Sequence, residues 1–319
     1  MRTKRLGKTD FDLSVLGLGA WAFGGGDWAF GWGPQDDAES IAAIHRAVRR
    51  GINWIDTAAV YGLGHSEEVV GRAIAAIPRS ERPRVFTKCG LVWKKKKIQQ
   101  RLDAESIRRE AEASLQRLGV ESIDLYQIHW PNESSIEEAW AALADLRREG
   151  KVRHIGVSNF DVGQLERIRE VVGVESLQPP YSLARREIES GILPYCFERE
   201  IGVIVYSPME SGLLTGKMTR ERIETLPESD WRKSKGDEFK EPKLSRNLEI
   251  AERLRPVAAR LDTSPGAVAV AWTLRNPAVT GAIVGARRPD QLDEILAAAD
   301  IALDEEDARA LELTPSVRS

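Results

Sequence analysis

Short apolar runs alternate with amphipathic segments along almost the whole chain. Eight runs have the length and composition of buried β-strands, at residues 15–18, 53–55, 84–87, 123–128, 152–157, 176–177, 203–205 and 282–284. Between them, apolar residues recur at helical spacing, as at Ile107, Ala111, Leu115 and Leu118. Buried parallel strands joined by helical crossovers have this pattern. Eight such units in 319 residues predict an α/β fold, a closed (β/α)8 TIM barrel rather than an open doubly wound sheet.

Two features lie outside this repeat. Residues 3–6 and 11–13 flank a turn at 7–10 and predict an N-terminal β-hairpin that caps the barrel. Residues 207–243, after the seventh strand, have no strong period and contain three prolines, which predicts a long loop acting as a functional lid or a disordered insert. Helices are expected at 244–261 and 265–274. No composition shift divides the chain, so residues 1–319 are expected to form a single domain.

Composition excludes several classes of function. The net charge of −3 gives no reason to expect nucleic acid as a partner. The only cysteines, Cys89 and Cys196, provide no disulfide framework and fit a reducing compartment. No run approaches the roughly 18 apolar residues of a membrane span, so we expect a cytoplasmic protein with no membrane partner. No His/Cys cluster has metal-ligand spacing, so no metal is expected. Nothing in the pattern fixes the oligomeric state.

Four residues of unlike chemistry follow successive strand-like runs: Asp56, Tyr61, Lys88 and His129. The carboxyl ends of barrel strands meet at one rim, where active sites collect. Tyr61 is the candidate general acid, because an ammonium group at Lys88, held by Asp56, would lower the pKa of the phenol. His129 could orient and polarise a carbonyl oxygen. Singly, each residue could be structural, and Lys88 could be a Schiff-base lysine, but the four together favour a proton-donating site.

Three motifs make the chain similar to the aldo-keto reductase superfamily. Residues 55–62, Ile-Asp-Thr-Ala-Ala-Val-Tyr-Gly, resemble its first signature, and Lys88 and His129 match the other two members of its catalytic tetrad. Residues 156–160, Gly-Val-Ser-Asn-Phe, resemble its cofactor motif. The details resemble most the bacterial inositol-pathway and general-stress reductases and the potassium-channel β subunits.

This resemblance implies an NADPH-dependent oxidoreductase that reduces an aldehyde, ketone or sugar-like carbonyl, or oxidises the corresponding alcohol in reverse. The alternative it leaves open is a slow-turnover, cofactor-binding regulatory subunit. NADP(H) is expected in preference to NAD(H). The residues assigned to the cofactor are Ala20, Trp21, Asp56, Ser158, Asn159, Gln178, Tyr206, Ser207, Pro208, Met209, Gly212, Leu213, Lys217, Gly285, Arg287, Gln291 and Glu294.

The residue types suit particular parts of that cofactor. Ser158, Asn159 and Gln178 could hold a carboxamide, and the Tyr206 ring could stack on the nicotinamide. Backbone amides of residues 207–213, with Lys217, could hold the pyrophosphate. Arg287, near a helix start, is the candidate reader of the 2′-phosphate. Ile295 stands where the family usually has asparagine, which removes one adenine contact.

The substrate pocket is expected to be aromatic. Trp21, Tyr61, Trp93, His129 and Trp130 are the candidate substrate contacts, and Trp28 and Trp32 lie in segments that open on the same rim. The four-lysine run 94–97 is interpreted as a solvated loop, and Cys89 as a small core residue.

Overall fold

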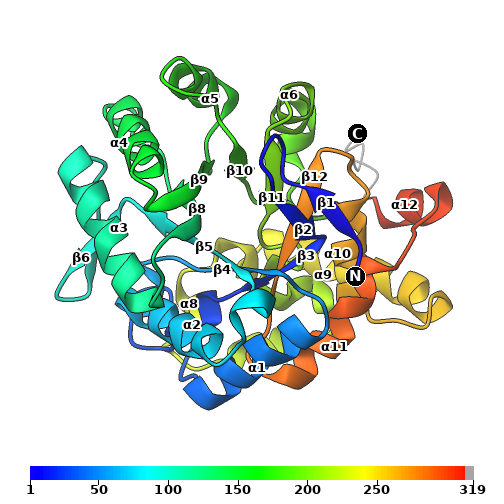
Figure 1. Cartoon of the computed structure of the whole chain (residues 1–319). Coiled ribbons are helices and arrows are strands. Elements are labelled where there is room, and N and C mark those ends of the chain that lie inside the picture. Colours follow the sequence, from blue (N-terminus) through cyan, green and yellow to red (C-terminus); the bar gives the residue numbers. More distant parts are fainter. Residues whose placement is uncertain (313–319) are drawn as a thin grey trace.

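The computed structural model describes residues 1–312 and has at its centre a closed barrel of eight parallel strands (Figure 1). Each strand pairs with the next along the chain, and the last closes on the first. The strands are β3 (Leu16–Gly19), β4 (Trp54–Asp56), β5 (Arg84–Cys89), β8 (Ile123–Ile128), β9 (Val152–Ser158), β10 (Ser176–Gln178), β11 (Gly202–Val205) and β12 (Val279–Gly285). All eight predicted runs overlap these strands, which confirms the predicted (β/α)8 TIM barrel.

Helices connect the strands and surround the barrel (Figure 1). They are α1 (Asp37–Arg49), α2 (His65–Ala75), α3 (Ala104–Leu118), α4 (Ile136–Arg148), α5 (Val162–Arg169), α6 (Ile192–Glu198), α9 (Lys243–Arg260), α10 (Pro265–Leu274), α11 (Pro289–Leu296) and α12 (Glu305–Leu311). Asp103 begins α3 by accepting a hydrogen bond from the Ser106 amide. The apolar stripe of α3 then packs on the barrel, where Ile107 and Ala111 share a buried cluster with Tyr126 of β8.

Inward-facing side chains fill the barrel in two layers. The lower layer is apolar and contains Trp54, Phe86, Leu125, Ile204 and Ile283. Side chains two residues apart on a strand face the same way. Four residues of the lower layer are each followed, two positions later, by an inward-facing polar residue at or just after the end of the strand. These polar residues are Asp56, Lys88, Gln127 and Tyr206. The chain thus places its polar side chains above an apolar base, at the carboxyl ends of the strands.

One tryptophan spans much of the apolar layer. Trp54 donates its indole N–H to the Ser14 carbonyl oxygen at 2.8 Å and is fully buried. Its ring lies directly over Gly17, where a Cβ atom would come within 2.3 Å of it, and close to Gly281, where the distance would be 3.1 Å. The two glycines therefore make the space that Trp54 fills.

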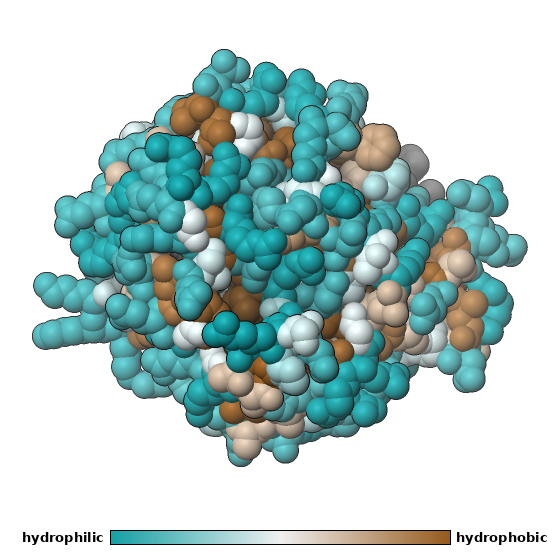
Figure 2. All heavy atoms as spheres, in the orientation of Figure 1, coloured by the Kyte–Doolittle hydropathy of each residue, from teal (hydrophilic) through white to brown (hydrophobic). Residues whose placement is uncertain are grey.

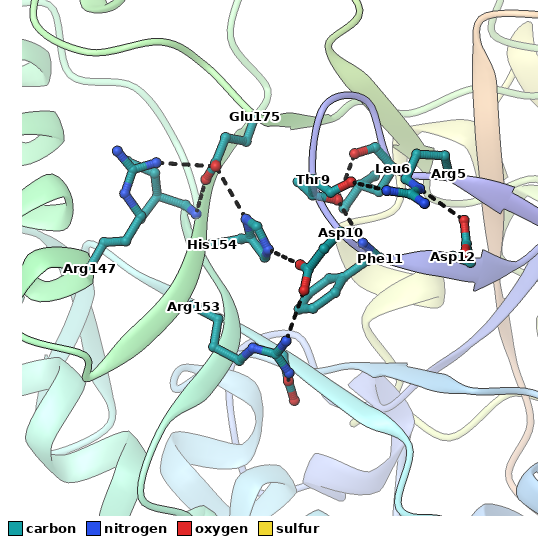
Figure 3. Close-up of polar contacts among 12 residues, drawn as sticks. Arg5, Leu6, Thr9, Asp10, Phe11, Asp12, Arg147, Arg153, His154 and Glu175 are labelled. Atoms are coloured by element: carbon teal, nitrogen blue, oxygen red, sulfur yellow. Dashed lines mark hydrogen bonds and ion pairs between the residues drawn. The ribbon is translucent and has the colours of Figure 1, made fainter.

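The predicted N-terminal hairpin is present and covers the lower end of the barrel. β1 (Thr3–Arg5) pairs antiparallel with β2 (Asp12–Ser14), and Leu6 and Phe11 join the apolar layer. Its turn is tied to β9, where His154 Nε2 lies 2.7 Å from Asp10 Oδ1 (Figure 3). The hairpin closes the end of the barrel opposite the polar layer.

Residues 207–243, expected to be a functional lid or a disordered insert, are ordered, and their role as a lid stays a prediction. They form short helices, η5 (Glu210–Thr215), α7 (Arg220–Glu224), α8 (Trp231–Ser234) and η6 (Asp237–Phe239). Leu213, Met218, Ile223, Phe239 and Leu244 give the segment a small apolar core of its own. Helices this short cannot display a repeating apolar period, which is why the sequence pattern did not reveal them.

The four-lysine run is also structured, because it forms the tip of a β-hairpin. β6 (Leu91–Lys94) pairs antiparallel with β7 (Lys97–Gln100), and Lys95 and Lys96 form the turn with positive φ angles. Leu91 and Ile98 pack toward the cluster around Trp28. The lysines are solvated as expected, but on a hairpin rather than in an irregular loop.

Most of the face seen in Figure 2 is hydrophilic, and its apolar residues form small separate patches. Among the helices of residues 1–312, none is both long and apolar enough to cross a membrane.

Candidate active site

A buried ion pair lies at the centre of the polar layer. Lys88 Nζ donates to Asp56 Oδ2 at 2.6 Å and to the Thr57 carbonyl oxygen at 2.9 Å. Lys88 is 1% exposed and Asp56 is 3% exposed, so each charge depends on the other for its stabilisation. An ammonium group has three N–H donors, and these contacts use two of them. The third donor remains for a group above the pair.

Tyr61 is that neighbouring group. It begins η2 (Tyr61–Gly64), in the turn after β4, and its ring centroid lies 5.4 Å from Lys88 Nζ and 5.7 Å from the His129 ring. Trp21 stacks on the Tyr61 ring at 6.1 Å, and Trp28 lies 6.0 Å from it. The four predicted residues therefore meet at one point, as the sequence indicated.

Burial raises the pKa of Tyr61 well above its usual value, and the Asp56 carboxylate adds to this effect. The net direction is therefore opposite to the lowering expected from Lys88, because burial dominates in the free protein. Burial likewise lowers the pKa of Lys88, although Asp56 opposes the change. Tyr61 consequently keeps its proton at neutral pH, which is the state a proton donor needs.

His129 follows β8 and faces the Tyr61 ring edge-on. Burial, and then the nearby Lys88 charge, lower its pKa well below the usual value. The imidazole is therefore neutral at neutral pH and carries one N–H that can donate. Its backbone is held on both sides, because His129 N donates to the Cys89 carbonyl at 3.0 Å and Asn159 Nδ2 donates to the His129 carbonyl at 2.9 Å.

The residues predicted to hold a carboxamide form one network with the ion pair. Ser158 Oγ donates to the Gln178 backbone carbonyl at 2.8 Å, and Gln178 Nε2 donates to Asp56 Oδ1, also at 2.8 Å. The Tyr206 hydroxyl donates to Asn159 Oδ1 at 2.8 Å. Gln178 Oε1 accepts no hydrogen bond from any side chain or backbone group of residues 1–312. An acceptor of this kind, beside fixed amide and hydroxyl groups, fits a nicotinamide carboxamide.

The turn after β11, which is predicted to hold the pyrophosphate, has an unusual backbone. Ser207, Glu210, Ser211 and Gly212 all have positive φ angles. The Glu210 and Gly212 amides already donate to the Ser207 and Met209 carbonyl oxygens, at 3.0 and 3.1 Å. The neighbouring Pro208 is buried and has no N–H, and the Leu213 side chain belongs to the small core of this segment, so of these two only the Leu213 backbone could donate to a ligand.

Three other predicted cofactor residues lie at or near α11. Lys217 forms an ion pair with Glu294, which ties the segment after η5 to this helix. Gly285 ends β12 with open space on its side-chain side. Ile295 is 8% exposed and packs in the main core, so at this position the helix contributes to packing.

Arg287 is half-buried between two loops. Its Nε donates to Gln35 Oε1 at 2.7 Å, and its Nη atoms donate to the carbonyl oxygens of Trp32 and Pro34. Its backbone amide donates to Gln291 Oε1 at 2.7 Å, so Gln291 caps the start of α11. The structure therefore places both residues at the loop after β12 but gives each a partner within the protein.

The residues expected to form an aromatic substrate pocket have different surroundings. Trp21 touches Tyr61, and Ala20, beside it, donates its amide to the Asp56 carbonyl oxygen at 2.8 Å. Trp130 is 47% exposed at the mouth of the site. Trp93, on the β6–β7 hairpin, has its ring centroid 5.9 Å from the Arg117 guanidinium of α3, and its role as a substrate contact stays a prediction.

A second aromatic layer, over Trp21, was not predicted. Trp231 of α8 stacks on Trp21 at 5.2 Å, with the ring planes 20° apart, and so forms a continuous stack down to Tyr61. Its position in a segment without periodicity gave no signal. The Trp231 amide donates to the Gly31 carbonyl at 3.0 Å, which holds the segment after β11 against the loop after β3.

Comparisons with known proteins agree with this geometry. The model of the aldo/keto reductase family matches residues 15–313. An aldo-keto reductase of Bacillus subtilis, YhdN, is 37% identical over 97% of this chain and 92% of its own. The NADH-specific methylglyoxal reductase of Escherichia coli is 38% identical over 97% of this chain and 96% of its own. The structure of the glycerol dehydrogenase AKR11B4 from Gluconobacter oxydans matches with a TM-score of 0.86 and 40% identity, over 97% of this chain and 93% of that one.

Proposed function

The chain belongs to the aldo/keto reductase family, and from that premise we propose that it reduces a small carbonyl substrate with NADPH, using Tyr61 as the proton donor. The observation that carries this proposal is the meeting of Tyr61 with the Lys88–Asp56 pair and the neutral His129. A reduced nicotinamide, when bound, supplies the hydride that adds to the carbonyl carbon.

The side chains of the site supply the other half of the reaction. His129 donates a hydrogen bond to the carbonyl oxygen and fixes its direction. As the C=O bond becomes a C–O single bond, Tyr61 transfers its hydroxyl proton to that oxygen. The phenolate that remains is stabilised by the third N–H of Lys88, whose charge Asp56 holds in place. Solvent then returns a proton to Tyr61.

The substrate and cofactor preferences are further parts of the proposal. Trp21 and Trp28 flank Tyr61 with apolar surface, which suits a compact carbonyl compound. One relative is named for methylglyoxal and another for glycerol, so these two compounds come first in a substrate screen. NADPH is proposed over NADH because Arg287, whose pKa is lowered first by burial and then by the nearby Arg232 charge, presents a cation that would favour a phosphate.

Replacing Tyr61 with phenylalanine tests the proton donor. Tyr61→Phe removes only the hydroxyl, so kcat for the best carbonyl substrate should fall at least about 100-fold. The dissociation constant for NADPH, followed by quenching of tryptophan fluorescence, should change by less than about twofold, since the ring is kept. Tyr195→Phe on the outer helix α6 is the matched control and should keep full activity. Near-normal turnover by the Tyr61 variant would refute the assignment.

A further inference from the structure

A second glutamine lies beside Gln178 inside the barrel. Gln127 is the inward residue of β8 above Leu125, and it is fully buried. Its Oε1 lies 3.4 Å from Gln178 Nε2. Gln127 is in none of the motifs that suggested the function.

Asp56 and Gln127 together determine which way the Gln178 amide points. A carboxylate only accepts hydrogen bonds, so Gln178 must turn its NH2 group toward Asp56 Oδ1. The second hydrogen of this NH2 group meets Gln127 Oε1. Both donors of Gln178 are then directed inward, and Oε1 is left as the part of the side chain that faces the site.

A glycine makes the contact between the two glutamines feasible. Gly156 of β9 lies between β8 and β10, in register with Gln127 on one side and Ser176 on the other. A Cβ atom at Gly156 would lie 3.3 Å from Gln127 Cγ and 3.0 Å from the Ser176 carbonyl oxygen. The missing side chain leaves room for Gln127 and Gln178 to meet across β9.

Packing alone does not explain a glutamine at position 127. Its Nε2 is buried and has no hydrogen-bond partner within the described residues 1–312. A buried amide without a partner destabilises the folded state, and an apolar side chain of similar size would avoid that cost. The hydrogen bond that the Gln127 side chain does make within residues 1–312 is the one that its Oε1 accepts from Gln178.

We propose that Gln127 is a positioning residue that fixes the Gln178 amide so that its Oε1 accepts a hydrogen bond from the carboxamide NH2 of the nicotinamide. This inference rests on the proposed function. Through Gln178, the same amide joins the carboxamide to Asp56, and hence to Lys88 beneath Tyr61. The residue proposed to orient the cofactor, Gln178, and the residue beneath the proton donor, Lys88, are thus both bound to Asp56.

The test compares two dinucleotides that differ only at the predicted contact. NADP+ has a carboxamide NH2, whereas its 3-acetylpyridine analogue has a methyl group there and cannot donate. Titration of tryptophan fluorescence should show that the natural protein binds NADP+ about five- to tenfold more tightly than the analogue. Gln127→Leu should reduce that preference to less than about twofold, while the melting temperature stays equal or rises.

Three further variants make the result specific. Gln127→Met keeps the side-chain length without the amide, so it too should lose the preference for NADP+. It replaces Gln127→Leu as the test if that variant folds poorly. Gln127→Glu, kept protonated by its burial, retains an acceptor and should restore most of the preference. Ser176 lies two residues before Gln178 on β10, and its hydroxyl is also buried without a partner among the described residues. Ser176→Ala removes this hydroxyl and should leave the preference for NADP+ unchanged.

Two results would overturn the inference without touching the proposed function. One is a natural protein that binds NADP+ and its analogue equally well, and the other is a Gln127→Leu variant that discriminates fully. Failure of the natural protein to bind any nicotinamide dinucleotide would instead contradict the proposed function itself.

Discussion

The Arg287 guanidinium bonds three groups of the loop after β3, and two of its five N–H donors remain. Gln35 holds this arrangement from both sides, because its Nε2 also donates to the Arg287 carbonyl oxygen at 2.9 Å. One side chain can thus brace two loops and still present donors to a phosphate. The position therefore has a structural role as well as the recognition role proposed for it.

Replacing Arg287 with alanine separates these two roles. If Arg287 reads the 2′-phosphate, Arg287→Ala should weaken NADPH binding about 10- to 100-fold and NADH binding much less, since NADH has no such phosphate. Fluorescence titration with both cofactors measures the difference. Arg288→Ala, at an exposed neighbour paired with Asp290, is the control and should change both affinities little. Equal losses for NADPH and NADH would leave only the bracing role.

The β6–β7 hairpin depends on one buried carboxylate at its base. Glu110 of α3 is 7% exposed and accepts the Gly90 amide at 2.9 Å and the Ser106 hydroxyl at 3.2 Å. Burial raises the pKa of Glu110 to about 7, against the pull of Arg109 and Arg117. Cys89 and Tyr126 also face this carboxylate, and burial raises the pKa of each as well. Hence neither of them bears a charge near neutral pH.

The raised pKa of Glu110 predicts a pH-dependent stability. The folded state favours the protonated acid, so its contribution is complete below about pH 4.5 and is lost as the pH rises through about 7. Relative to Glu110→Gln, the natural protein should lose about 2 to 3 kcal/mol of unfolding free energy between pH 5 and pH 8. Urea denaturation of both proteins measures this loss. Glu105→Gln, at an exposed position of the same helix, should show no such difference. A constant gap between the natural protein and Glu110→Gln would show that the carboxylate is charged at both pH values.

Across the whole molecule, the two ends of the barrel have different tasks. The upper rim holds the groups that we propose to react, and the N-terminal hairpin covers the lower end and contacts β9 through His154 (Figure 3). His154 Nδ1 lies 3.2 Å from Glu175 and Nε2 lies 2.7 Å from Asp10. Arg147 and Arg153 pair with the same two carboxylates, and the Phe11 ring packs edge-on at 4.5 Å.

The stabilisation that His154 gives to the contact between the N-terminal hairpin and β9 should fall as the pH rises. Burial alone lowers the pKa of His154, but the hydrogen bonds and charges of Glu175 and Asp10 outweigh it and raise the pKa above its usual value. The stabilisation is therefore complete below about pH 6.5 and is lost as the pH rises through the higher folded-state pKa. Compared with His154→Gln, the natural protein should lose unfolding free energy between pH 6 and pH 9. Urea denaturation tests this, with His45→Gln as the control, and a gap independent of pH would contradict it.

Sequence alone predicted the barrel because its strands are buried on both faces and are therefore apolar throughout. It also located Asp56, Tyr61, Lys88 and His129, since each has unusual chemistry at a strand end. It could not find Gln127, because a single polar residue inside an apolar strand carries no period. Nor could it pair Gln35 with Arg287, which are 252 positions apart. Contacts between distant loops depend on how the chain closes, and no local pattern records that.

The seating of Trp54 over Gly17 restricts the routes by which this chain can change. A Cβ atom at Gly17 would lie 2.3 Å from the indole, so no residue larger than glycine can appear there first. A smaller residue at position 54 would leave a cavity in the barrel until its neighbours had grown. Mutational paths through this layer must therefore reduce the tryptophan before they enlarge the glycine, with a less stable intermediate between. Homologous chains that descend from this one should therefore keep Gly17 wherever they keep Trp54.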